Sequence, residues 1–293
     1  MEKHLSKLEQ FTKLSAPKVS FEFFPPKTPE ATDTLWKVIK ELEELSPEFV
    51  SVTYGAGGTT REYTHKTVEY IKNKTSLTPA AHLTCVGATK EEVNEVARGY
   101  WDIGVRHIVA LRGDPPEGQA KYTPYPGGYE YSVDLVKGLK EIADFEISVA
   151  SFPETHPEAE SQEKDLEYLK RKIDAGASRT LTQYFFDTGL YLSFRERAVA
   201  AGVSVPIVPG ILLITNFKQM VNFSKRCGAT VPEWLGNLLN ETDETPEKRD
   251  IISAIIASEQ CRILREEGVE QFHFYTLNRP TLAKSVCHIL GIR

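Results

Sequence analysis

The sequence predicts a single (β/α)8 TIM barrel that spans residues 1–293, with extra helices before its last strand. Eight runs of strand length, rich in apolar, β-branched and aromatic residues, recur with helical segments between them. The first seven runs start 27 to 39 residues apart, which is the length of one strand, one helix and two loops. Because neither a flexible linker nor a change in composition divides the chain, the pattern favours one barrel. A doubly wound open sheet is the alternative that the pattern leaves open.

The predicted strands and helices alternate along the chain. The strands cover residues 19–24, 49–54, 79–85, 107–112, 146–152, 179–186, 206–212 and 272–277. Apolar residues at three- and four-residue spacing predict helices over Thr34–Leu45, Tyr63–Asn73 and Glu91–Trp101. Gly176 and Gly202 follow alanines just before the sixth and seventh strands, where a helix needs a glycine to end.

The interval before the last strand is longer than the others. It holds three segments of helical pattern, residues 216–227, 232–239 and 245–267. Residues 1–18 are expected to form a helical extension ahead of the first strand. The whole chain is therefore predicted to be one catalytic barrel domain.

Composition and charge exclude several classes of protein. The chain carries 35 Lys and Arg against 41 Asp and Glu, a net charge of −6, and lacks the basic stripe of a duplex nucleic-acid binder. The longest apolar stretch, residues 207–214, contains Pro209 and Gly210 and is far shorter than the roughly 20 residues of a membrane span. The N-terminus has no apolar core of a secretory signal, so we expect a cytoplasmic protein.

The cysteines and histidines predict neither disulfides nor a metal site. No two of the four cysteines form a CxxC pair, and the seven histidines lack HxH or HxxxH spacing. Reduced, mostly buried thiols are the expectation for Cys85, Cys227, Cys261 and Cys287.

Polar residues end almost every predicted strand, at the edge where barrels of this class carry their active sites. Glu22 lies in an aromatic run, and burying a carboxylate without a partner is costly, so we favour a functional role over a stray charge. An apolar wall would favour its neutral form, as a general acid requires. His82 is either a core histidine or a site residue, and the sequence leaves both open.

Two short segments at the same edge suit ligand binding. Residues 55–58, Gly-Ala-Gly-Gly, are either a tight turn or a place where the backbone approaches a flat or phosphorylated ligand. They are not a dinucleotide fingerprint, because the third glycine and the following acidic residue are missing. Arg112, Gly113 and Asp114 combine a cation for an anionic group with a carboxylate for a heterocycle. An internal ion pair is the alternative.

Several long motifs together resemble one family. The motifs are SFEFFPPK (20–27), VSVTYGAGG (50–58), AHLTC (81–85), RHIVALRGD (106–114), HPEA (156–159), DAGASRTLTQYFFD (174–187), PGI with NFKQ (209–211 and 216–219) and FHFYTLNR (272–279). They are similar to methylenetetrahydrofolate reductase of the short bacterial type. The resemblance runs in order over all eight strands, and it leaves no room for the regulatory domain of the eukaryotic enzymes.

The resemblance implies an FAD-dependent oxidoreductase of one-carbon metabolism. It would reduce 5,10-methylenetetrahydrofolate to 5-methyltetrahydrofolate with NADH or NADPH in a ping-pong reaction and supply methyl groups for methionine synthesis. Glu22 would be the general acid for the folate. Asp114 would lie beside flavin and folate, where its charge stabilises a cationic iminium. The family forms dimers or tetramers, so a homo-oligomer is expected.

The resemblance also assigns binding residues. Positions that match those lining FAD are Thr53, Tyr54, Ala56, His82, Arg112, Gly113, Asp114, Tyr131, Ser132, Phe152, His156, Ala159, Asp165, Tyr168, Arg171 and Lys172, with Arg171 and Lys172 facing the pyrophosphate. Positions that match substrate contacts are Asp114, Gln183, Gln219, Phe223 and Arg279.

Three features depart from the family pattern. Phe152 stands in place of a tyrosine and Tyr168 in place of an asparagine, so FAD affinity or potential is expected to differ. Residues 115–128 are longer and richer in Pro, Gly and Tyr than expected. Three other functions stay open at this stage: a non-redox folate- or pterin-binding barrel, a methyltransferase, and an assembly scaffold.

Overall fold

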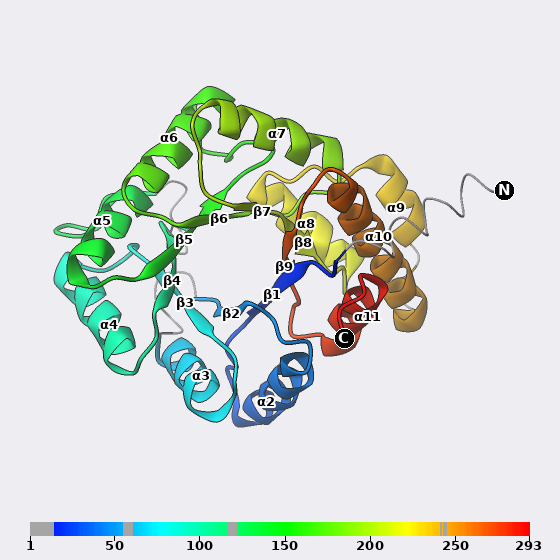
Figure 1. Ribbon diagram of the computed structural model, residues 1–293, viewed down its shortest axis with the longest axis horizontal. Coiled ribbons are helices and arrows are strands. Elements are labelled where there is room, and N and C mark those ends of the chain that lie inside the picture. Colours follow the sequence, from blue (N-terminus) through cyan, green and yellow to red (C-terminus); the bar gives the residue numbers. More distant parts are fainter. Residues whose placement is uncertain (1–14, 55–60, 116–121, 241, 243–244) are drawn as a thin grey trace.

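The computed structural model of the chain describes residues 15–54, 61–115, 122–240, 242 and 245–293. They form a barrel of parallel strands inside a ring of helices (Figure 1). The strands are β1 (Lys18–Phe23), β2 (Phe49–Val52), β3 (Pro79–Thr84), β4 (His107–Leu111), β5 (Glu146–Ser151), β6 (Arg179–Thr182), β7 (Ile207–Val208), β8 (Gly210–Leu212) and β9 (Gln271–Tyr275). The helices are α2 (Pro29–Glu43), α3 (Arg61–Lys74), α4 (Lys90–Asp102), α5 (Ser132–Ile142), α6 (Gln162–Asp174), α7 (Thr188–Ala200), α8 (Phe217–Cys227), α9 (Glu233–Leu239), α10 (Pro246–Glu266) and α11 (Pro280–Ile289).

The sheet confirms the predicted barrel, with one strand divided. The order is β7-β6-β5-β4-β3-β2-β1-β9-β8, and every pairing is parallel. The predicted seventh strand consists of β7, which pairs with β6, and β8, which pairs with β9. Pro209 lies between them and has no N–H to donate, while its carbonyl accepts from His273 N at 3.0 Å. The chain therefore changes partner at Pro209, and this change brings the two ends of the sheet together.

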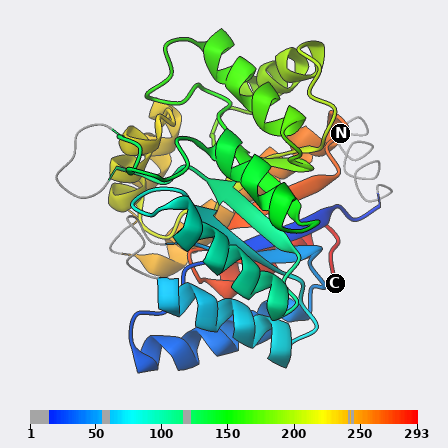
Figure 2. The ribbon, with the colours of Figure 1, turned by 90° about the vertical axis from the view of Figure 1, so that its left-hand side faces the viewer.

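The helices follow the prediction closely. Helices α8, α9 and α10 are the three predicted segments before the last strand, and they lie together at one side of the barrel (Figure 1). Figure 2 shows other helices packed along the outside of the strands. Gly176 and Gly202 have φ angles of 115° and 86°, as the glycine that ends a helix requires. Of the predicted extension, residues 15–17 are not helical and Lys18 begins β1; residues 1–14 lie outside the described part.

Side chains alternate between the two faces of the barrel wall. Phe21 and Phe23 are fully buried in the main core between strands and helices. Phe49 and Val109 belong to a smaller apolar cluster contributed by β2, β3, β4, β6 and β7. At the amino end of the strands, Arg179 pairs with Glu146 at 2.8 Å and its guanidinium carbon lies 5.0 Å from the centre of the Phe49 ring. The apolar cluster and this cation support the polar groups at the opposite rim.

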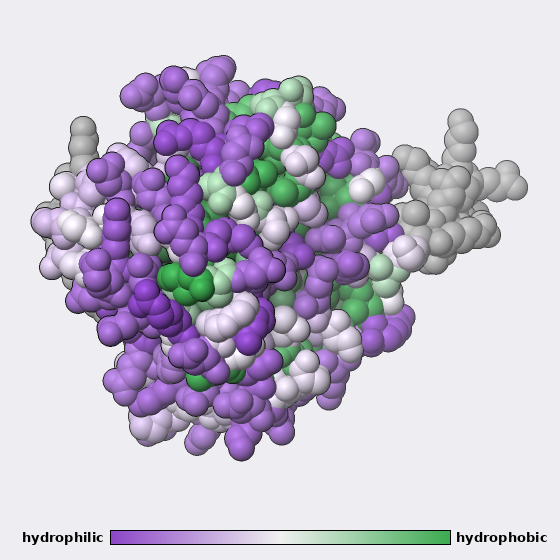
Figure 3. Space-filling model, turned by 60° about the vertical axis from the view of Figure 1, so that its left-hand side comes forward, coloured by the Kyte–Doolittle hydropathy of each residue, from purple (hydrophilic) through white to green (hydrophobic). Residues whose placement is uncertain are grey.

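Hydrophilic side chains predominate on the face shown in Figure 3, with hydrophobic ones gathered in patches. Among the described residues, none of the helices has both the length and the apolar character needed to cross a bilayer. In the same part of the chain, no group of three or more His, Cys, Asp or Glu side chains could hold a metal ion.

Candidate active site

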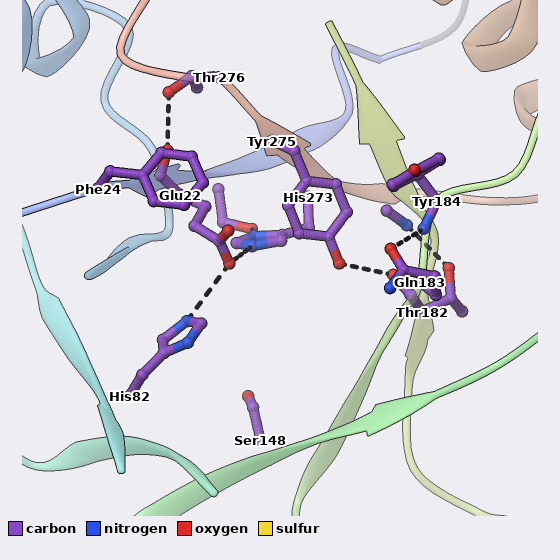
Figure 4. Close-up of polar contacts among 12 residues, drawn as sticks. Glu22, Phe24, His82, Ser148, Thr182, Gln183, Tyr184, His273, Tyr275 and Thr276 are labelled. Carbon is purple, nitrogen blue, oxygen red and sulfur yellow. Dashed lines mark hydrogen bonds and ion pairs between the residues drawn. The ribbon is translucent and has the colours of Figure 1, made fainter. Parts of the chain in front are cut away.

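Glu22 lies at the centre of a cluster of buried polar side chains (Figure 4). Its side chain extends from β1 and is 9% exposed as a residue. The carboxylate Oε2 lies 3.4 Å from His82 Nε2 on β3 and 3.8 Å from His273 Nε2 on β9. Both distances are longer than an ordinary hydrogen bond, so the imidazoles lie close to the carboxyl group without fixing its orientation.

The surroundings of Glu22 differ from the expected apolar wall. Phe21 and Phe23 point to the opposite face of β1, because successive side chains of a strand alternate. The carboxyl group instead faces two imidazoles. His82 is thus a neighbour of the candidate acid, and its buried Nε2 faces the Glu22 carboxylate without forming an ordinary hydrogen bond.

Each of the two histidines presents its Nε2 atom to the Glu22 carboxyl group. Burial lowers the pKa of His82, and the nearby Glu22 charge opposes this shift. His273 Nδ1 lies 2.8 Å from Ser20 Oγ, which is 3.3 Å from the Phe272 carbonyl. If the serine donates to that carbonyl, His273 Nδ1–H donates to the serine and Nε2 presents its lone pair to Glu22. In this tautomer Nε2 is an acceptor for a protonated carboxyl group.

A second group of side chains forms the adjoining wall of the rim. The Tyr275 hydroxyl donates to the Thr182 carbonyl at 2.8 Å, and Gln183 follows directly on the chain (Figure 4). The close approach of Tyr275 to the Thr182 carbonyl requires glycine at position 210, because a Cβ there would lie 2.2 Å from Thr182 O and 2.5 Å from the Tyr275 ring. Tyr184 lies edge-on to Tyr275, with ring centres 6.3 Å apart. Gln183 is therefore held beside two aromatic rings.

Helix α8 brings further predicted residues to this wall. Asn216 caps the helix by accepting from Gln219 N at 2.8 Å. Phe223 is 46% exposed and stacks on Tyr184 at 6.1 Å between ring centres. Gln219 and Arg279 are exposed, and they follow β8 and β9 at the same edge of the barrel. The structure thus places Phe223 against Tyr184, which follows Gln183, and leaves Gln219 and Arg279 exposed to solvent.

The loop after β4 lies close to the end of α8. Gly113 has a φ of 90°, and a Cβ there would lie 2.5 Å from Val86, so only glycine fits. Asp114 is exposed, and its charge adds to burial in raising the pKa of Cys227 to about 11. Arg112 forms an ion pair with Glu158. The alternative of an ion pair between Arg112 and Asp114 is not what the structure shows.

The predicted cofactor residues on α5, α6 and the preceding loops lie near one another. Asp165 accepts from His156 N at 2.8 Å, and the rings of Phe152 and His156 meet edge to face at 4.6 Å. Tyr131 caps α5, with its ring centre 5.9 Å from that of Tyr168. Ser132 begins α5, Ala159 donates to the His156 carbonyl, and Arg171 is exposed on α6.

Two features of this region fit a phosphorylated ligand. Lys172 is 6% exposed, its Nζ donates to the Ala150 carbonyl at 2.5 Å, and burial lowers its pKa to about 8. A buried ammonium gains strongly from an anion. The Tyr168 hydroxyl is shielded from solvent and lies beside Ser132 and the Val133 backbone at the start of α5. The donor set therefore fits the phosphates and sugars of a dinucleotide.

The remaining predicted residues lie beside the barrel or outside the described part. Thr53 N donates to the Phe23 carbonyl, and Tyr54 follows it. Ala56 and the rest of the segment 55–58 lie outside the described residues. The sequence pattern places Tyr275 to Arg279 among the polar groups that follow the last strand, but it did not identify His273 and Ser20, although alternation along FHFYTL places His273 and Tyr275 on one face.

Fold and site together define a (β/α)8 barrel of the enzyme type, with a buried glutamate at the rim where such barrels carry their active sites. The sequence matches the family described as Methylenetetrahydrofolate reductase over residues 7–291. It is 50% identical over 275 residues to the 5,10-methylenetetrahydrofolate reductase of Escherichia coli strain K12, covering 94% of this chain and 91% of that protein. The chain belongs to the methylenetetrahydrofolate reductase family, and it is an oxidoreductase.

More distant proteins share the fold or part of the sequence. Methylenetetrahydrofolate reductase (NADH) 1 of Arabidopsis thaliana is 33% identical over 301 residues, which cover 99% of this chain and 51% of that protein. A solved Clostridium thermocellum protein, described as binding two copies of 5-methyl-5,6,7,8-tetrahydrofolic acid, superposes with a TM-score of 0.65. It covers 97% of both chains at 15% identity and so supports the barrel fold alone.

Proposed function

We propose that this chain reduces 5,10-methylenetetrahydrofolate to 5-methyltetrahydrofolate with FAD as bound cofactor and NADH or NADPH as electron donor. The product would supply methyl groups for methionine synthesis. The observation that carries the proposal is the Glu22 carboxyl group, buried at the rim between His82 and His273 in a member of this family. Such a group can deliver a proton to a substrate that enters over the strands.

FAD, when bound, would accept hydride from the nicotinamide and pass it to the folate. Lys172 and Arg171 would hold its pyrophosphate, with Arg112 as a further cation and Asp165 and Tyr168 beside the sugars. The buried ammonium of Lys172, with the Arg171 guanidinium next to it on α6, supports this assignment. Phe152 has no hydroxyl to donate, so it would pack against the cofactor rather than hydrogen-bond to it.

Glu22 would act on the folate alone. Protonation of a folate nitrogen opens the methylene bridge and leaves a cationic iminium, which is the hydride acceptor. His273 Nε2 and His82 would orient the carboxyl group and stabilise its proton. Asp114 would then face a developing positive charge, an attraction that is strongest once the substrate excludes water.

The two substrates would use the same place in turn. Gln183 lies beside Tyr184 and Tyr275, and Phe223 presents an exposed ring that can stack on either flat substrate. Gln219 and Arg279 would hold the folate, whose carboxylates suit a guanidinium. Reduced nicotinamide would react and leave before the folate enters, which is a ping-pong order.

The direct test measures each half-reaction by stopped-flow spectroscopy on purified protein. We expect a yellow protein with absorbance near ~450 nm that NADH bleaches and methylenetetrahydrofolate restores. A folded protein that takes up no FAD would contradict the flavin part. Folate binding without NADH consumption would indicate a non-redox folate-binding barrel or methyltransferase instead.

The donor, the location and the assembly belong to the same proposal. NADH is the first choice, since the Arabidopsis relative carries NADH in its name. Comparing kcat/KM for NADH and NADPH decides between the two donors. We also propose a cytoplasmic homo-oligomer, a dimer or tetramer, and light scattering on the purified protein checks its mass.

A further inference from the structure

Three tyrosine side chains lie in a row on the α5 and α6 side of the barrel mouth and form a wall of rings that are tilted against one another. The ring centres of Tyr122 and Tyr131 are 5.9 Å apart, and those of Tyr131 and Tyr168 are also 5.9 Å apart. Tyr131 is 41% exposed, so the middle of the wall is open to a ligand. Tyr122 comes from the segment after Asp114 that departs from the family pattern.

Tyr122 is held in place by contacts at its edge and on its face. Its hydroxyl donates to the Glu130 carbonyl at 2.8 Å and lies 3.8 Å from Cys85 Sγ. The guanidinium carbon of Arg112 lies 4.5 Å from its ring centre. The ring is therefore a fixed part of the wall.

Cations lie at both ends of the wall. Arg112 covers Tyr122, while the Arg171 guanidinium carbon and Lys172 Nζ lie 5.4 Å and 5.6 Å from the Tyr168 ring centre. Aromatic rings between cations suit a ligand that joins a heterocyclic base to phosphates, because the base can stack on an open ring face while the phosphates pair with the cations.

The wall lies away from the chemical centre. Glu22, Gln183 and Phe223 belong to β1, the end of β6 and α8, whereas the tyrosines belong to the loop after β4 and to α5 and α6. The flavin ring that reacts with the folate must lie beside Glu22. The tyrosine wall would therefore contact the other end of an extended cofactor.

We propose that Tyr122 is a nucleotide-binding residue, which completes with Tyr131 and Tyr168 an aromatic wall for the adenosine half of FAD. This inference rests on the proposed function, since it assumes that the bound flavin is the dinucleotide. It gives the segment that differs from the family pattern, residues 115–128, a role in distinguishing FAD from FMN and riboflavin, which lack adenosine.

The test compares flavin binding to the purified full chain after its flavin has been removed. FAD, FMN and riboflavin are titrated by flavin fluorescence against wild type, Tyr122→Ala and Tyr122→Phe. Tyr125→Ala is the matched control, because Tyr125 lies in the same segment, is 44% exposed and forms no ring pair with the residues that the structure describes. Circular dichroism and thermal melting check folding, and competition of AMP with FAD on wild type needs no variant.

Stacking of a base on an aromatic ring predicts that Tyr122→Ala weakens FAD binding about tenfold and FMN binding less than about twofold. Tyr122→Phe keeps the ring and should stay within about threefold of wild type, as should Tyr125→Ala. AMP should compete with FAD. Equal weakening of FAD and FMN would place the ring at the flavin and overturn the inference. Unchanged FAD binding in Tyr122→Ala, or no competition by AMP, would overturn it as well.

The outcome separates this inference from the proposed function. Wild-type protein that binds no flavin refutes the flavin part of the proposed function, and the inference with it. Wild-type protein that binds FAD and completes both half-reactions, while Tyr122→Ala binds FAD normally, refutes the inference alone.

Discussion

Replacing Glu22 with glutamine tests the proposed acid without changing the shape of the site. The amide matches the carboxyl group in size, so the distances to His82 and His273 should persist, and flavin binding on the α6 side should be unaffected. What the variant loses is the transferable proton. Hydride transfer from NADH to the flavin needs no such proton, whereas the folate half-reaction does.

The expected magnitude follows from the role of a positioned general acid. Such a group contributes about 10² to 10⁴ in rate, which is roughly 3 to 5 kcal/mol of activation free energy. In Glu22→Gln, reoxidation by methylenetetrahydrofolate should therefore slow by about 10² to 10⁴, while flavin reduction by NADH should change less than about twofold. Rapid-mixing absorbance of each half-reaction at saturating substrate measures both rates on one preparation.

Two results would refute the reasoning about Glu22. An equal fall in both half-reactions would show that the residue supports the flavin or the fold rather than the folate chemistry. An unchanged folate half-reaction would show that the proton comes from another group. Ser20→Ala is a companion variant, because it removes the partner of His273 Nδ1 while leaving Glu22 intact. It should slow the folate half-reaction by less than Glu22→Gln does.

Three further predictions concern stability and anion binding. Gly210→Ala should destabilise the barrel by about 1–3 kcal/mol through overpacking, whereas Gly99→Ala, with nothing within 4 Å of its Cβ, should not, and calorimetry measures both. The pKa of Lys172 is lowered to about 8, below its unfolded value, so the stability of the flavin-free protein should rise with pH between about 8 and 10.5 as the unfolded state keeps its proton. Over the same range FAD binding should weaken, because the anion needs the protonated lysine; Lys172→Arg should flatten both pH profiles. Arg179→Met should lower stability by no more than about 1 kcal/mol, because it removes the ion pair with Glu146, which is 45% exposed, and the contact with the Phe49 ring; kcat should be unchanged, as urea unfolding and steady-state assays can show.

The sequence could predict the barrel because its repeating unit is local. One strand and one helix recur at nearly constant spacing, and the helices α8, α9 and α10 carry patterns that locate them within a residue or two. The division of the seventh strand at Pro209 has a visible signal, a proline inside an apolar run. Which neighbour each half joins depends on closure of the sheet, and that is not a local property.

The surroundings of Glu22 could not be predicted in the same way. Its flanking phenylalanines are neighbours in sequence but point into the outer core, whereas His82 and His273 come from β3 and β9, which lie on either side of the β1–β2 pair in the sheet. The sequence therefore pointed to Glu22 as a candidate acid but did not predict the side chains that surround it. A polar pair from distant strands surrounds the carboxyl group, where an apolar wall was expected.

The helices before the last strand contribute side chains and contacts to the candidate site. They add no strand to the barrel, yet α8 carries Phe223 over Tyr184. The carboxyl end of α8 contacts the opposite side of the mouth. Thr230 N, just after α8, donates to the carboxylate of Glu154, which follows β5, at 2.9 Å. The charge of Asp114, which follows β4, contributes to the raised pKa of the Cys227 thiol. A Cβ at Gly228 would lie 2.9 Å from Pro157, so the two loops meet at backbone distance. The inserted helices therefore connect the side of the rim that carries Phe223 and Tyr184 to the loops after β4 and β5 on the opposite side.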